Sequence, residues 1–157
     1  MGAGLFDHAS EVRATSTMSM VEDVLITLGH FVNDCRDPQP DSLAAWRIRH
    51  GSAVVEIVLR ARGEHSHLRV ASAVVHAGPT TDRAAMWSEL LTRNAELCGL
   101  AFAIRGDQVL LVTERSTLDL DRTEVHDMIE RTAALADHVD DDLAARHGAV
   151  LGAAPRA

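Results

Sequence analysis

Two glycine-led turns divide residues 46–75 into three segments whose side chains alternate between apolar and polar. The segments are Trp46–His50, Ala53–Arg62 and His65–Val75, and Gly51-Ser52 and Gly63-Glu64 separate them. A glycine in the first position of a two-residue turn supplies the positive φ that a tight antiparallel hairpin requires. The sequence therefore predicts a three-stranded antiparallel meander.

Two-residue turns also fix which residues lie opposite one another on neighbouring strands. The apolar residues of the meander then pair on a single face, with Ile48 opposite Val55, Trp46 opposite Ile57, Leu59 opposite Leu68 and Ile57 opposite Val70. The glycine turns and the alternation of apolar and polar side chains predict the same strand pairing, so we expect this apolar face to lie in the core.

A second hairpin, turned at Gly106-Asp107, is apolar on both faces. One face carries Leu100, Phe102, Ile104, Val109 and Leu111, and the other carries Ala101, Ala103, Leu110 and Val112. An antiparallel sheet with one solvated face should be polar on that face. The second face is therefore covered either by a helix of the same chain or by a partner at a subunit interface.

Three helices are predicted around these strands. A capping box at Ser19–Glu22 predicts a helix that ends at the loop beginning with Asp37-Pro38. A second helix follows Gly78-Pro79, with a threonine cap, and stops at Gly99. A third starts at Asp121, where Glu124 completes a capping box, and ends at Gly148.

The element order is helix, three strands, helix, two strands, helix, which indicates an α+β fold with helices against an antiparallel sheet. We expect a single domain over residues 19–148. Residues 1–18 are weakly patterned and form an arm or a short helix, and residues 149–157 form a flexible tail.

Composition excludes several classes of protein. The 157-residue chain carries a net charge of −8, which disfavours nucleic acid as a partner. It has no run of about 18 apolar residues, so we expect no membrane span. Its first ten residues lack the basic start and apolar stretch of a secretory signal, so we expect a cytoplasmic protein.

The outer face of the predicted meander is rich in arginine. It gathers Arg47, Arg49, Arg60, Arg62 and Arg69, together with His65 and His67. Arginine forks bind carboxylates and phosphates bidentately, so this stripe is a candidate surface for an anion or an acidic peptide. The alternative is an ordinary solvated sheet face whose charges discourage aggregation.

Catalytic and metal sites are not indicated. His65 and His67 supply two ligands, whereas structural zinc needs four and catalytic zinc three. Cys35 and Cys98 each come at the end of an apolar helical pattern, so we expect them to be buried and unreactive. The sequence has no phosphate-binding loop and no GxSxG or HExxH motif. We therefore expect no enzyme activity, no metal and no cofactor.

The stretch Trp87–Asn94, the hairpin at Gly106-Asp107 and the closing helix Met128–Gly148, in this element order, resemble the YbjN family. That family is similar to the type III secretion chaperone fold, and the resemblance covers residues 19–148. The resemblance implies a small acidic α+β protein that is commonly a homodimer. The secretion chaperones hold an extended, partly unfolded client segment, and the resemblance carries over no catalytic residue.

Two functional hypotheses follow. The first is a non-enzymatic, chaperone-like module that binds a protein client and dimerises through a surface of Ala101, Ala103, Leu110, Val112 and Trp87. The second is a regulatory or sensory domain that binds an anionic ligand through the arginine stripe.

Overall fold

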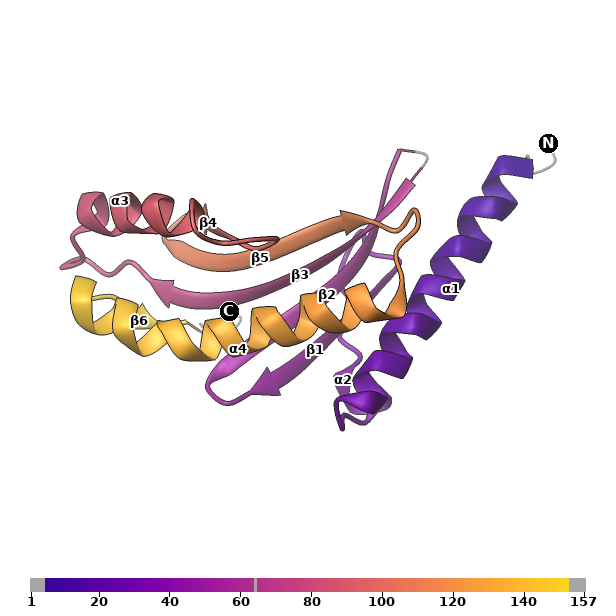
Figure 1. The fold of residues 1–157 in the computed structure, drawn as a ribbon, viewed down its shortest axis with the longest axis horizontal. Helices are drawn as coiled ribbons and strands as arrows, with labels where there is room; N and C mark the ends of the chain where they lie inside the picture. Colours follow the sequence, from indigo (N-terminus) through magenta and orange to yellow (C-terminus); the bar gives the residue numbers. More distant parts are fainter. Residues whose placement is uncertain (1–4, 64, 153–157) are drawn as a thin grey trace. The chain divides into compact units, whose positions relative to one another are not determined.

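The computed structural model describes residues 5–63 and 65–152, and side chains from Val12 onward (Figure 1). Its helices are α1 (Leu5–Thr27), α2 (Val32–Cys35), α3 (Arg83–Asn94) and α4 (Arg122–His147). Its strands are β1 (Ala44–His50), β2 (Ala53–Arg62), β3 (His65–His76), β4 (Ala101–Arg105), β5 (Gln108–Ser116) and β6 (Val150–Leu151). The strands form a sheet in the order β1-β2-β3-β5-β4, with β6 paired to β3. The predicted α+β class is confirmed.

The chain divides into two compact units, which are described separately. The first unit comprises Met1–Ile48, Glu56–Val70 and Glu114–Ile129, and the second comprises Arg49–Val55, Ala71–Thr113 and Glu130–Ala157.

The predicted meander is confirmed. Strand β2 has the predicted bounds. Strand β1 begins two residues earlier than predicted, at Ala44, and β3 ends one residue later, at His76. Gly51 and Gly63 have φ angles of 57° and 61°, as the predicted turns require. The residues assigned to the core face are all buried, namely Trp46, Ile48, Val55, Ile57, Leu59, Leu68 and Val70.

In the first unit, helix α1 runs without a break through the predicted start at Ser19. The capping box at Ser19–Glu22 was therefore a wrong prediction. The buried stripe continues towards the N-terminus through Ala14 and Thr17, and reaches Val21, Val24 and Leu25 at helical spacing. Small and polar residues occupy the early part of this stripe, so hydrophobic periodicity did not reveal it.

The first helix also ends earlier than predicted, at Thr27. Gly29 has a φ of 86°, and the His30 N–H donates to Leu25 O at 2.9 Å. This is the bonding pattern of a Schellman motif, in which a left-handed glycine ends the helix. The residues that follow form the separate short helix α2, so Val32 does not belong to the first helix.

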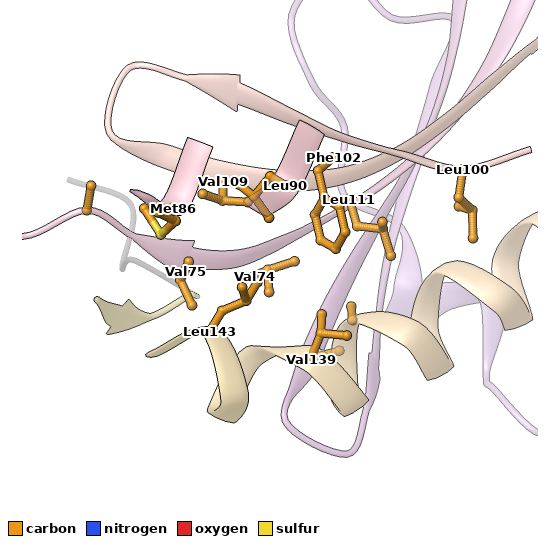
Figure 2. Packing of buried hydrophobic residues seen from close by; sticks show 13 residues of the cluster. Val74, Val75, Met86, Leu90, Leu100, Phe102, Val109, Leu111, Val139 and Leu143 are labelled. Carbon is orange, nitrogen blue, oxygen red and sulfur yellow. The ribbon is translucent and has the colours of Figure 1, made fainter. Parts of the chain in front are cut away.

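The second unit has an apolar core built from both hairpin strands and two helices (Figure 2). Met86 and Leu90 of α3 and Val139 and Leu143 of α4 join the cluster. They pack with Val74 and Val75 of β3, with Phe102 of β4 and its neighbour Leu100, and with Val109 and Leu111 of β5. The predicted inward face of the hairpin is thus confirmed for four of its five residues, since Ile104 is 49% exposed.

Both predicted ends of α3 are wrong. Asp82, not a threonine, caps the helix, because its Oδ1 accepts the Ala85 N–H at 3.0 Å. Thr81 instead accepts from Gly78 N and donates to Gly148 O. The helix ends at Asn94, before Gly99, and the Asn94 side chain bonds to the backbone of Phe102. Cys98 therefore lies beyond the helix and is exposed, contrary to prediction.

The predicted capping box of α4 is confirmed. The Glu124 N–H donates to Asp121 Oδ1 at 2.8 Å, and the Asp121 N–H donates to Glu124 Oε2 at 3.1 Å. Leu120 and Val125 are both buried beside this cap, as a hydrophobic staple requires. The predicted end is also confirmed, because the helix stops at His147 and Gly148 has a φ of 63°.

Replacing Asp121 by alanine removes the acceptor for the Glu124 N–H at the start of α4. We expect the free energy of unfolding to fall by about 1 kcal/mol. Chemical denaturation followed by circular dichroism measures it. Asp141→Ala, at an exposed position of the same helix, is the control and should leave stability unchanged or slightly raised. Equal effects of the two substitutions would contradict the role of the cap.

A charged network joins α3 to α4 in the second unit. Arg93 Nη2 donates to Glu89 Oε1 at 2.5 Å and to Asp142 Oδ2 at 2.8 Å. His147 Nε2 lies 2.7 Å from Glu89 Oε2, and Arg146 bonds to Asp142. Partial burial alone would raise the pKa of Glu89, but hydrogen bonds and charge from His147 and Arg93 outweigh it and hold that pKa below its usual value.

A carboxylate whose pKa is lower in the folded state adds stability above its unfolded pKa. That contribution disappears as the pH falls from about 4.3, the ordinary glutamate value, through the lower folded pKa. We therefore expect Glu89→Gln to reduce stability at pH 7 and to flatten the loss of stability in this acidic range. Part of the slope should remain, because Arg93 and Arg146 also lower the pKa of Asp142.

Denaturation at a series of pH values from 7 to 3 tests this expectation. Glu96→Gln, at an exposed glutamate just beyond α3, serves as the matched control and should follow the original chain. An unchanged acid profile for Glu89→Gln would show that ionised Glu89 contributes nothing to stability.

Candidate functional site

A pocket in the first unit lies between α1 and the segment that leads into β1. Its volume is about 350 Å³. Helix α1 contributes Thr15, Met18, Ser19 and Glu22, and the other wall comes from Arg36, Pro38, Gln39, Ser42, Leu43, Ala44, Ala45 and Trp46. We call this pocket the α1 groove.

The α1 groove combines apolar surface with fixed polar groups. Leu43 is 48% exposed, whereas Trp46 is buried in the wall. Glu22 Oε1 accepts from Arg36 Nη2 at 2.6 Å and from Trp46 Nε1 at 3.4 Å. An apolar cleft with a few oriented polar groups is the usual form of a ligand site.

One polar group of the groove has no partner among the described residues. Gln39 Nε2 is buried without a hydrogen-bond acceptor, although the Gln39 carbonyl accepts from Ser42 Oγ at 2.7 Å. An unsatisfied buried donor costs about 1–3 kcal/mol.

The edge strand β1 is partly covered beside the groove. The Asp37 N–H donates to Ala45 O at 2.9 Å, and Arg36 forms an isolated antiparallel bridge with Trp46. On the other side, the Leu43 N–H donates to Leu59 O at 2.8 Å. The backbone of the groove wall is thereby fixed, so a ligand would meet side chains in a rigid frame.

Most of the arginine stripe is neutralised within the chain. Arg47 bonds to Asp37 at 2.9 Å and to Glu56 at 2.7 Å. Arg62 and Arg69 both lie within 3.5 Å of Glu114. Arg49 is exposed, and Arg60 Nε is buried without an acceptor among the described residues. This arrangement lends no support to an anion site on the stripe.

The proposed dimer surface in the second unit is partly exposed. Ala101 lies opposite Val112 and Ala103 opposite Leu110, so these four residues share the predicted face. Ala101 is exposed, Ala103 and Val112 are half-buried, and Leu110 is 4% exposed. Trp87 is half-buried against the core cluster.

Two apolar residues of the second unit are exposed although their spacing predicts burial. Leu91 on α3 is 71% exposed and Ile104 on β4 is 49% exposed. Helical spacing places Leu91 on the apolar stripe of its helix, and strand alternation places Ile104 on the inward face of the hairpin. The pattern of hydrophobicity alone does not distinguish a core residue from an exposed apolar residue.

Asn94 closes part of the outer edge of β4. Its Nδ2 donates to Phe102 O at 3.1 Å, and its Oδ1 accepts the Phe102 N–H at 2.7 Å. The amide thus replaces one residue of a neighbouring strand. The backbone of Phe102 is therefore not available to pair with a partner strand at this edge.

The candidate catalytic and metal residues are not brought together. Burial, reinforced by the charge of Asp34, raises the pKa of the Cys35 thiol, which opposes thiolate formation. In the part of the chain that the structure describes, no group of three or more His, Cys, Asp or Glu side chains is arranged to hold a metal ion. Within the same residues, no helix is long and apolar enough to cross a membrane.

Comparison with known proteins identifies the family. Residues 16–151 match the family described as "T3SS (YopN, CesT) and YbjN peptide-binding chaperone 1". The chain belongs to this family. The predicted resemblance to YbjN proteins and type III secretion chaperones is thus confirmed, and the matched region begins three residues before the predicted domain.

A solved structure supports the fold of this chaperone family. A chain in the crystal structure of the ExsC-ExsE complex superposes with a TM-score of 0.61 at 13% sequence identity. The superposition covers 83% of this chain and 95% of the other. No curated protein matches the sequence.

Proposed function

We propose that this family member is a non-enzymatic chaperone that binds an extended segment of a protein client in the α1 groove. The family description supports peptide binding, and the groove supplies a place for it. The observation that carries the assignment is the exposed Leu43 side chain beside the fixed Glu22–Arg36 pair in the groove. An extended peptide offers both apolar side chains and backbone hydrogen-bonding groups.

The similar chain from the ExsC-ExsE complex adds support, because it was solved together with a second protein. The client of the present chain is defined by its expected chemistry. It should present an aliphatic side chain to the exposed Leu43. Such binding depends mainly on apolar contact, so it should weaken little as salt concentration rises.

Peptide selection tests the groove. A phage-displayed library of random 12-residue peptides is selected against the original chain, and the affinity of a selected peptide is measured by fluorescence anisotropy. We expect Leu43→Glu to weaken binding at least tenfold, about 1.4 kcal/mol, because it places a charge on the apolar wall.

Leu118→Glu is the matched control, because Leu118 is 47% exposed in the same unit and does not line the groove. It should leave the affinity unchanged. If both substitutions weakened binding equally, or neither did, the selected peptide would bind elsewhere and the groove assignment would be wrong.

We further propose that the chain acts as a homodimer through the outer face of the second hairpin and the exposed side of α3. The small residues Ala101 and Ala103 allow close approach of a second copy. Leu91 on α3 adds exposed apolar surface in the same unit. Exposed apolar area on a monomer commonly marks a protein interface.

Ala103→Arg should split this dimer, because the long charged side chain cannot be buried there without a partner. Light scattering should give twice the 17.0 kDa chain mass for the original protein and a single chain mass for the variant. Ala61→Arg, at an exposed position of β2, is the control and should remain dimeric. If the Ala103→Arg variant remained dimeric with an unchanged circular dichroism spectrum, the dimer interface would not include this face of the hairpin.

A further inference from the structure

The C-terminal strap, residues 148–152, occupies a strand position beside the end of β3. Leu151 pairs with Val75 and Val150 pairs with His76, both antiparallel. On the other side of β3, the Ala77 N–H donates to Asp107 O at 2.8 Å, so the β4–β5 hairpin takes that position. The sequence predicted a flexible tail here, and for Val150–Leu151 that prediction was wrong.

We propose that this strand position is a second peptide site, which accepts an extended client segment with glycine as its third residue. It goes beyond the α1 groove and shares no residue with it. In the isolated chain, the strap fills the position as an intramolecular competitor. Addition of an extended segment to an available strand is a general mode of peptide recognition.

The requirement for glycine comes from Gly152. A Cβ atom at this position would lie 2.5 Å from Val74 O and closer still to Ala73 O. These are backbone atoms of β3, which cannot move without disturbing the sheet. The Gly152 carbonyl also lies 3.1 Å from His76 Nε2, within hydrogen-bond distance. The third residue of an incoming segment therefore has to lack a side chain.

The strap is held mostly through its backbone. Val150 is 62% exposed and Leu151 is 48% exposed, so little apolar area is buried by either side chain. Further attachments are Thr81 Oγ1 to Gly148 O at 3.1 Å and Ala149 N to Ala144 O at 3.2 Å, and Ala149 packs against the core cluster. Backbone contacts do not depend on side-chain identity at the first two positions, so another extended segment can replace the strap.

Departure of the strap leaves the backbone of Val75 and His76 without its strand partner. Unpaired strand edges readily recruit another extended segment. The hinge for this movement is Gly148, whose φ of 63° glycine adopts at little cost. The strap can therefore leave β3 while α4 stays folded.

The test uses the full chain with Gly152→Ala, which expels the strap and leaves β3 intact. The probe is a fluorescein-labelled peptide that copies residues 146–157. We expect the variant to bind this peptide at least tenfold more tightly than the original chain. Gly78→Ala is the matched control, because a Cβ at Gly78 meets its neighbours at an ordinary 3.8 Å. It should behave like the original chain.

Hydrogen exchange verifies that the strap has left, because the amides at the end of β3 and in β6 should then exchange faster. Val150→Pro is a second releasing variant, since proline removes the Val150 N–H. A probe peptide with alanine in place of its Gly152 should bind neither variant. If the strap is released and the peptide still does not bind, the peptide site is refuted, whatever the outcome at the α1 groove.

Measurement of molar mass distinguishes the two segments that could occupy the strand position beside β3, a client segment and the strap of a second copy of the chain. Binding of the probe by a released chain whose oligomeric state is unchanged supports a client segment. If the releasing variants lose an oligomer that the original chain forms, and mixed chains cross-link from residue 151 of one copy to residue 75 of another, the occupant is the strap of a second copy. That result would overturn the assignment to a client.

Discussion

Strand β3 is the element on which the rest of the structure depends. It pairs with β2, β5 and β6, and it contributes residues to both compact units. Its first half carries Leu68 and Val70 into one core, and its second half carries Val74 and Val75 into the other. The two halves differ in pattern, because apolar and polar residues alternate from His67 to Val70, whereas Ala71–Val75 is almost wholly apolar or small and mostly buried.

The parts of the fold that local chemistry determines could be predicted from the sequence. Glycine at the first turn position and alternating side chains specify the meander, because each has one low-energy arrangement. The capping box at Asp121 and Glu124 is correct for the same reason, since two side chains satisfy two backbone amides. The same pattern at Ser19–Glu22 gave a wrong helix start, because these residues lie inside a helix whose buried stripe includes Ala14 and Thr17.

The α1 groove and the strap could not be predicted, because both depend on contacts between segments far apart in the sequence. Nothing in Leu43 or Gln39 taken alone separates a groove residue from an ordinary loop residue. Gly152 reads as part of a small-residue tail until β3 is placed beside it. The end of α1 just before Gly29 could have been predicted, because a glycine after an apolar helical stripe is a recognised stop signal. The prediction placed the end later because the loop at Asp37-Pro38 also predicts a helix end.

The sheet of this chaperone-family chain has its strand edges largely occupied by its own residues. Arg36 and Asp37 cover part of β1, Asn94 bonds to Phe102 on β4, and the strap pairs with β3. Guarding edges in this way prevents uncontrolled pairing with other chains. A protein that handles extended polypeptides has particular need of it, because its ligands are themselves strand-like. On our proposals, binding takes place in the α1 groove, where side chains select the ligand, or at the end of β3 once the strap is displaced.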